Sequence, residues 1–199
     1  MIAIIDYCMG NLRSVQKGFE RVGKKAFVSS NPKEIIKSEK ILLPGVGAFG
    51  EAVYHLENMK LKDCIIEMAK KGTPILGICL GKQLLMEESE EGGLFKGLGL
   101  IPGRVIKFKE GKKIPHIGWN QIEIQKDVPL LKNIPDNSFF YFVHSYYAVP
   151  MSDGYVIAVT DYEEEFPSII GDKNVFGAQF HPEKSQELGL EILKNFAEL

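Results

Sequence analysis

Short apolar runs recur through the first half of the chain, and each is followed by a segment with helical spacing. The runs are uninterrupted, as is typical of strands buried on both faces of a sheet. They are "IAIID", "AFVSS", "KILLPGVG" and "TPILGI". Repeated strand–helix units of this kind predict a parallel sheet covered by helices on both faces.

Helices are predicted after each of these runs. The first carries apolar residues at helical spacing and ends at Gly23, and the second begins with Asn31 as N-cap and Pro32 at its first position. One or two helices follow over residues 51–70. The fourth is expected over residues 81–89, "GKQLLMEES", directly after the fourth strand.

After about residue 98 the pattern changes to strand-like segments joined by turns, of which "GDKN" is the clearest. The tail "SQELGLEILKNFAEL" is amphipathic and predicts a helix capped by Ser185. The whole pattern predicts an α/β fold: one central mixed, mostly parallel sheet flanked by helices, with antiparallel C-terminal strands. Because no linker or repeat interrupts it, we expect a single domain over residues 1–199.

Composition and charge exclude several classes of protein. The 199 residues are 45% hydrophobic with a net charge of −2, which indicates a globular core and gives no electrostatic basis for binding nucleic acid or an anionic membrane. Cys8, Cys64 and Cys79 are scattered and odd in number, so neither a disulfide framework nor a metal site is expected. With no signal peptide or membrane span in the pattern, we expect a cytoplasmic protein that needs no cofactor.

Cys79 is the strongest candidate for chemistry. It lies between an apolar strand and a helix, with Gly77 and Gly81 on either side, in a G-x-C-x-G frame. A sharp turn there would hold the sulfur above the sheet, at the N-terminus of a helix that favours the thiolate. A lone cysteine is more often a buried, inert residue, but this frame favours a nucleophile.

A thiol nucleophile needs a base, and the base needs a group to orient it. His181 stands apart in "QFHPEKS": Pro182 favours an extended backbone, which would project His181 and Glu183 to the same side. His55 is interpreted as a surface residue, whereas His116 and His144 remain possible bases.

Acyl transfer also requires donors aimed at the developing oxyanion. The backbone N–H of Leu80, directly after the nucleophile, is one candidate. Val46 is the other, since Gly45 and Gly47 leave its peptide free to turn its N–H toward the site. A plain turn at "LLPGVGAFG" is the alternative.

Together, "GICLGKQLL", "LLPGVGAFG", "PHIGWN", "FVHSYY" and "QFHPEKS" resemble the class I, triad-type glutamine amidotransferases. More narrowly, they resemble the glutaminase subunits of imidazole glycerol phosphate synthase, and the resemblance spans nearly the whole chain. It implies a flavodoxin-like class I glutaminase fold, and a triad of Cys79, His181 and Glu183 that hydrolyses glutamine through a γ-glutamyl thioester.

The resemblance also implies further site residues and a partner. Those that hold glutamine map to five positions: Gly47, Gln83, Glu91, Ser145 and Tyr146. Those that face a separate (β/α)8-barrel cyclase subunit, the heterodimer partner that takes the ammonia in histidine biosynthesis, map to four: Trp119, Asn120, Tyr141 and Lys184. The alternatives are a glutaminase for another synthase, such as anthranilate or aminodeoxychorismate synthase, a cysteine peptidase or chaperone-like protein of a related fold, or a non-catalytic binding module.

Two residues depart from the family pattern. Position 82 is Lys where the family usually has an apolar residue, and Cys8 replaces a small glycine. Lys82 is one helical turn from Cys79, so its ammonium would either lower the thiol pKa or face the partner; we expect it to be solvated instead. Cys8 is expected to be inert.

Overall fold

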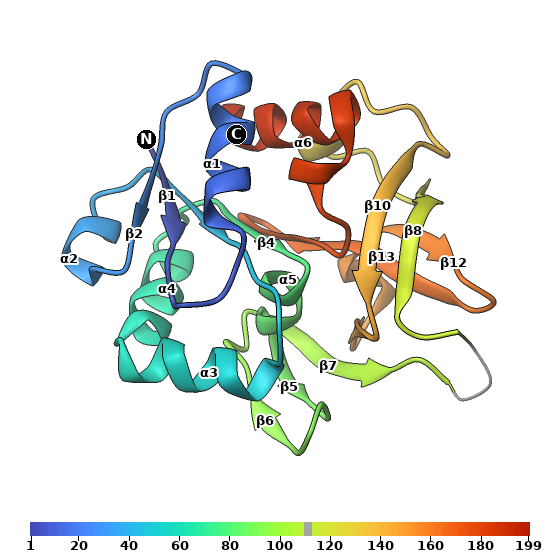
Figure 1. Cartoon of the computed structure of the whole chain (residues 1–199), viewed down its shortest axis with the longest axis horizontal. Helices are drawn as coiled ribbons and strands as arrows, with labels where there is room; N and C mark the ends of the chain where they lie inside the picture. Colours follow the sequence, from blue (N-terminus) through green and yellow to red (C-terminus); the bar gives the residue numbers. More distant parts are fainter. Residues whose placement is uncertain (110–112) are drawn as a thin grey trace.

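The computed structural model describes residues 1–109 and 113–199, and its largest sheet has eight strands in the order β2-β1-β3-β4-β14-β13-β12-β9 (Figure 1). Five neighbouring strands run parallel: β1 (Ile2–Ile5), β2 (Ala26–Ser29), β3 (Lys40–Leu43), β4 (Ile75–Ile78) and β14 (Val175–Ala178). The antiparallel part adds β13 (Glu165–Asp172), β12 (Val156–Asp161) and β9 (Glu123–Ile124). The mixed sheet is therefore the one that the pattern predicts.

Helices cover both faces of the parallel strands. One face carries α1 (Leu12–Arg21) and α6 (Gln186–Glu198), which lie side by side in Figure 1. The other face carries α2 (Pro32–Ile35), α3 (Phe49–Asn58), α4 (Leu61–Lys70) and α5 (Leu80–Leu84). Asn31 caps α2 by accepting a hydrogen bond from the N–H of Lys33 at 3.0 Å, as the sequence predicts.

The core divides into two layers because successive strand residues point to opposite faces. In β1, Ile2 and Ile4 pack with the α1 and α6 side, whereas Ala3 and Ile5 pack with the α2–α5 side. All four are buried, which accounts for the uninterrupted apolar runs.

The remaining strands form two smaller sheets beside the central one, so they do not all join a single mixed sheet as the sequence suggests. β10 (Phe139–His144) pairs with β8 (His116–Gln121) in an antiparallel ribbon. A four-stranded sheet has the order β11-β7-β5-β6, made of β11 (Tyr146–Pro150), β7 (Ile101–Lys107), β5 (Met86–Ser89) and β6 (Phe95–Lys96). The apolar run "SFFYFVHSYYAV" thus breaks at Ser145 between two sheets. The remaining elements are the 3-10 turns η1 (Pro129–Leu131), η2 (Asp153–Tyr155) and η3 (Pro182–Lys184).

Two helix predictions need correction. The helix after the fourth strand ends at Leu84, and residues 86–89 form β5 because they pair with β6 and β7. Ser185 stands at the N-cap position of α6, but its hydroxyl donates to the carbonyl of His181 at 2.6 Å and makes no capping bond. Within the described residues, no helix has the length and apolar character needed to cross a bilayer.

Candidate active site

Cys79 lies on a strained turn between β4 and α5. Its φ of 54° is in the left-handed region, which a residue with a side chain rarely adopts. The neighbouring glycines are required: a Cβ at position 81 would lie 1.8 Å from the Leu43 carbonyl oxygen, and one at position 77 would lie 2.6 Å from the Gly81 backbone. The geometry is that of a nucleophile elbow, which directs the side chain out from the end of the strand.

α5 is only five residues long, so the local backbone amides matter more here than a helix dipole. The first amides of a helix have no acceptor inside the helix. The Leu80 N–H, directly after Cys79, is therefore free to donate to a group bound at the sulfur. Val46, the other oxyanion candidate, lines the same cavity.

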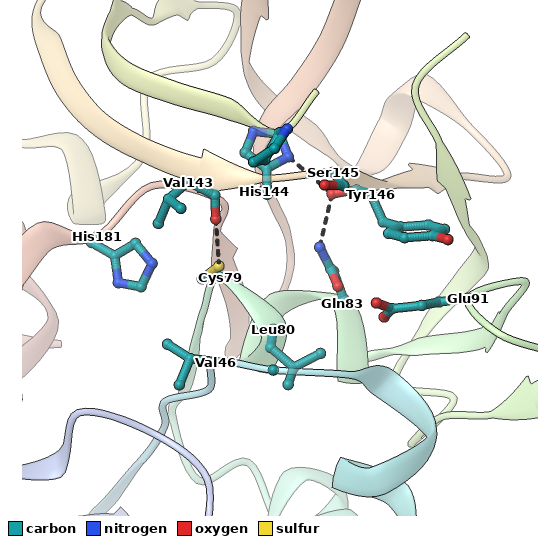
Figure 2. Close-up of a pocket in the computed structure, with 12 residues that line it drawn as sticks. Val46, Cys79, Leu80, Gln83, Glu91, Val143, His144, Ser145, Tyr146 and His181 are labelled. Carbon is teal, nitrogen blue, oxygen red and sulfur yellow. Dashed lines mark hydrogen bonds between the residues drawn. The ribbon is translucent and has the colours of Figure 1, made fainter. Parts of the chain in front are cut away.

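His181 and Glu183 are paired next to the sulfur. The Nδ1 of His181 lies 2.8 Å from Oε1 of Glu183, and both side chains are almost fully buried. An ionised carboxylate can only accept a hydrogen bond. Nδ1 therefore carries a proton and donates a hydrogen bond to Glu183. The His181 ring lies beside Cys79 (Figure 2), and its Nε2 has no hydrogen-bond partner among the described residues. That nitrogen is available to a reacting group.

The electrostatics of this pair favour a charged imidazole. Burial lowers the pKa of His181, but interactions with Cys79 and Glu183 outweigh burial and raise it to about 10. A cation beside the sulfur stabilises the thiolate, the reactive form of cysteine.

The local geometry of this pair differs from the one expected. His181 is extended, with φ −101° and ψ 97°, as Pro182 predicts. Glu183, however, lies in the 3-10 turn η3, not in an extended segment. The two side chains meet because the chain folds back tightly at Pro182, and not because they alternate along a strand.

A cavity of about 310 Å³ opens beside Cys79, and residues from six separate segments of the chain line it (Figure 2). Nine of them are residues that the sequence assigned to the catalytic, oxyanion or glutamine-binding positions: Val46, Gly47, Cys79, Leu80, Gln83, Glu91, Ser145, Tyr146 and His181. The other three are Pro115, Val143 and His144. The volume is at the small end of the range for ligand sites, which fits a metabolite the size of an amino acid.

Polar contacts order the walls of this cavity. The Nε2 of Gln83 donates to the Tyr146 carbonyl at 2.8 Å, joining α5 to β11 (Figure 2). The Oε2 of Glu91 accepts from the N–H of Phe49 at 2.9 Å, which leaves its other oxygen for a ligand. Gly47 has φ 100°, a conformation that favours glycine.

Sequence comparisons agree with this geometry. The sequence model of the family described as Glutamine amidotransferase class-I matches residues 3–199. The imidazole glycerol phosphate synthase subunit HisH of Methanocaldococcus jannaschii is 52% identical over 199 residues, with 100% of both chains covered. The protein of the same name from Geobacter sulfurreducens is 49% identical, with 100% of this chain and 98% of that chain covered. This chain belongs to the class I glutamine amidotransferase family.

Solved structures agree with the fold of this amidotransferase. One described as glutamine amidotransferase superposes with a TM-score of 0.79 at 16% identity and covers 100% of both chains. PurLQS from Thermotoga maritima gives a TM-score of 0.80 at 18% identity, covering 99% of this chain and 97% of that chain. At such identity the likeness concerns the fold alone, and it confirms the predicted α/β architecture.

His116 and His144 of the amidotransferase are hydrogen-bonded to each other. His144 Nδ1 donates to the Tyr146 carbonyl at 2.9 Å, so its Nε2 must accept from His116 Nδ1 at 3.1 Å. Burial lowers the pKa of His116 to about 4 and holds the pKa of His144 well below 6.5. Both rings are therefore neutral at pH 7. Neither offers a free nitrogen to Cys79, which leaves His181 as the base candidate.

Sequence reasoning missed three groups around the nucleophile. The Val143 carbonyl lies 3.7 Å from the Cys79 sulfur, and the Nε2 of Gln179 lies 3.9 Å from it. The Tyr7 hydroxyl donates to the Pro44 carbonyl at 2.6 Å and so fixes the start of the turn that carries Val46. The position of Tyr7 in the sequence could have identified it as a site residue. It comes two residues after the end of β1, at the sheet edge where α/β sites form.

The expectation that Lys82 is solvated is wrong. Its side chain is completely buried, and its ammonium donates to the Pro167 carbonyl and, at 3.5 Å, to Oε1 of Gln179. Gly177 makes room for it: a Cβ there would lie 2.6 Å from Lys82 Cγ. Burial lowers the pKa of Lys82 to about 7, although the nearby Cys79 raises it.

Three of the four residues expected at the partner face lie together. The rings of Trp119 and Tyr141 are 6.2 Å apart, and the Lys184 ammonium lies 5.9 Å from the Tyr141 ring centroid. Trp119 is 45% exposed, so part of its ring is available to a partner. Asn120 is not in this group, because its amide donates to the Asp161 carbonyl at 2.9 Å and contacts His116.

Phe140 and Phe142 are core residues, as expected. Cys8 is exposed, and Cys64 is buried. Within residues 1–109 and 113–199, no three His, Cys, Asp or Glu side chains are grouped so as to hold a metal ion.

Proposed function

We propose that this chain is the glutaminase subunit of an imidazole glycerol phosphate synthase, and that it hydrolyses glutamine to supply ammonia for histidine biosynthesis. The synthase subunits named above support this, because they are about half identical to the chain over its full length. The observation that carries the chemistry is His181, which is paired with Glu183 at 2.8 Å beside Cys79 on the wall of one cavity.

The reaction begins at the sulfur. The Cys79 thiolate attacks the side-chain carbonyl carbon of glutamine, and the carbonyl π electrons move to oxygen. The N–H groups of Leu80 and Val46 donate to that oxyanion, each contributing roughly 10²–10³ in rate. The His181 imidazolium gives its Nε2 proton to the amide nitrogen, the C–N bond breaks, and ammonia leaves behind a γ-glutamyl thioester.

The second half returns the enzyme to its starting state. Neutral His181 takes a proton from water through Nε2 while the water oxygen attacks the thioester carbonyl. The C–S bond then breaks, Cys79 leaves as thiolate, and glutamate is released. Glu183 stays ionised throughout, holding the ring by its Nδ1 proton and stabilising its positive charge.

The cavity walls supply groups for the amino-acid end of the substrate. Glu91 offers a carboxylate to the α-ammonium group, and the backbone at Gly47, Ser145 and Tyr146 offers hydrogen-bonding groups close by. Gln83 holds the Tyr146 carbonyl in place at 2.8 Å. A glutamine so anchored presents its side-chain amide to Cys79.

The ammonia is delivered to a (β/α)8-barrel cyclase subunit in a heterodimer, where imidazole glycerol phosphate and AICAR are formed. The exposed cluster of Trp119, Tyr141 and Lys184 supports docking at this face, since exposed aromatic anchors are typical of interface hot spots. Asn120 lies on β8 and orders this strand by donating to the Asp161 carbonyl. Sheltered transfer matters because ammonia released into neutral water is protonated and no longer nucleophilic.

This proposal includes a single catalytic domain over residues 1–199, acting in the cytoplasm. The two core layers share one eight-stranded sheet, which supports one domain. The three free cysteines suit a reducing compartment.

Glutamate release by the purified chain, mixed with a barrel cyclase subunit and its phosphoribulosyl-formimino acceptor, tests this function. We expect turnover to rise when both are present and to be slow with the chain alone. Stimulation by chorismate with its synthase subunit, and none by the barrel, would instead indicate a glutaminase for anthranilate or aminodeoxychorismate synthase. Failure of a glutamine-analogue electrophile to label Cys79 would indicate a binding module.

A further inference from the structure

Lys82 is a buried cation that the reaction above does not use. Its ammonium has two oxygen partners, the Pro167 carbonyl and Gln179 Oε1, and both are neutral. Within residues 1–109 and 113–199, no carboxylate forms an ion pair with it. A lysine held in this way costs folding free energy, because burial disfavours the charge and nothing opposite compensates it. A structural role alone gives a poor account of such a residue.

The ammonium determines which way the Gln179 carboxamide points. The charged ammonium of lysine can only donate, so the atom of Gln179 that faces this form must be the oxygen, Oε1, at 3.5 Å. The NH₂ group then faces the Cys79 sulfur at 3.9 Å. With the amide reversed, an oxygen would lie against the sulfur in its place. A donor stabilises a thiolate, whereas an acceptor stabilises the protonated thiol.

We propose that Lys82 is a positioning residue for the nucleophile: it locks Gln179 so that an N–H points at the Cys79 sulfur and favours the thiolate. The inference rests on the glutaminase function proposed above. It assigns Lys82 and Gln179 to a second support of the sulfur, separate from His181 and Glu183. Gly177 supports the same arrangement, because only a residue without a side chain leaves space for the aliphatic part of Lys82.

The surroundings of Lys82 make its charge sensitive to the sulfur. Two titratable groups among the described residues interact with it: Cys79, directly before its own helix, and His144 on β10. The negative charge of a Cys79 thiolate raises the pKa of Lys82, and the positive charge of Lys82 contributes to the low pKa of His144.

The pH profile of Cys79 alkylation tests the inference. Iodoacetamide labelling at residue 79 is followed by mass spectrometry in a Cys8→Ser background, which removes the exposed thiol. The variants are Lys82→Met, of similar length, Gln179→Leu, and the pair combined. Lys70→Met on the exposed side of α4 is the matched control.

We expect the midpoint of the alkylation profile to move to higher pH by at least about half a unit in Lys82→Met and in Gln179→Leu. The double variant should shift no further, since both changes act on one contact. In the complex with the barrel subunit, kcat for glutamine hydrolysis at pH 7 should fall several-fold. The KM for glutamine should stay unchanged, because Lys82 does not line the cavity. Lys70→Met should match the wild type.

Two outcomes would overturn the inference. One is an unchanged alkylation profile in folded Lys82→Met, as judged by circular dichroism. The other is a shift in Lys82→Met but none in Gln179→Leu, which would mean that the ammonium does not act through Gln179. Alkylation needs no glutamine, so an absence of glutaminase activity in the wild-type complex would count against the proposed function alone.

Discussion

Two buried cations flank the same sulfur, and their surroundings give them opposite behaviour. His181 is paired at 2.8 Å with the carboxylate of Glu183, and its pKa is raised to about 10. Lys82 faces a carbonyl and a carboxamide oxygen, with no carboxylate paired to it among the described residues, and its pKa is lowered to about 7. Burial disfavours the charged form of both side chains. A counter-charge within hydrogen-bond distance decides which effect dominates.

The difference separates two roles. His181 has an unpartnered Nε2 beside the cavity, so it can exchange protons with a substrate. The Lys82 side chain is enclosed by the protein and is linked to Cys79 by hydrogen bonds through Gln179, so it can orient the sulfur's neighbour but does not line the substrate cavity. The two sides of Cys79 therefore supply proton transfer and positioning respectively.

The largest expected effect is on the His181 side. His181→Gln keeps a polar side chain but removes the proton shuttle, so kcat for glutamine hydrolysis in the complex should fall on the order of 10³-fold. Glutamate release measures it. His55→Gln on α3, outside the Cys79 cavity, should leave the rate unchanged. A loss below about tenfold would mean that the two cations do not differ in role as described.

The next effect tests the turn that holds the sulfur between the two cations. Gly81→Ala would place a Cβ 1.8 Å from the Leu43 carbonyl, a clash with backbone that β3 cannot avoid. We expect the free energy of unfolding to drop by about 3 kcal/mol or more, measured by denaturant titration. Gly154→Ala, where the nearest atom is a serine hydroxyl at 3.2 Å, should change it by less than about 0.5 kcal/mol. Equal effects in the two variants would contradict the tight packing of the elbow.

Sequence patterns predicted the parts of this site that depend on local order. The elbow follows from Gly77 and Gly81 around Cys79. The pairing of His181 with Glu183 was predicted from an extended segment, whereas in the structure it arises from the tight turn at Pro182. The apolar runs predicted every parallel strand of the first half, because burial on both faces leaves a continuous pattern.

The patterns failed where distant segments decide the outcome. Residues 86–89 are compatible with a helix, but pairing with β7 makes them a strand. Lys82 is one turn from Cys79 by spacing, yet its burial depends on Gly177, 95 positions later, and on an acceptor at Pro167. Spacing alone gives the face of a helix on which a residue lies, but not what covers that face.

The smallest expected effect concerns stability and pH. An unfolded Lys82 keeps its proton up to about pH 10.4, whereas the folded residue loses it above about pH 7. Between these values the unfolded chain binds more protons, so Lys82 makes the wild type more stable as pH rises, by at most about 1.4 kcal/mol per unit. Below pH 7 the full cost of burying the charge remains.

Lys82→Met removes this titration. We therefore expect any stability advantage of the variant over the wild type to be largest below pH 7 and to shrink between pH 7.5 and 9.5, as measured by urea unfolding. Loss of the donor to Pro167 and Gln179 costs the variant a constant amount, so the slope of the difference is the informative quantity and not its sign at one pH. Lys70→Met, whose lysine is exposed, should show no such slope. A flat difference for Lys82→Met would mean that its ammonium stays charged across this range, held by a compensating charge as His181 is by Glu183.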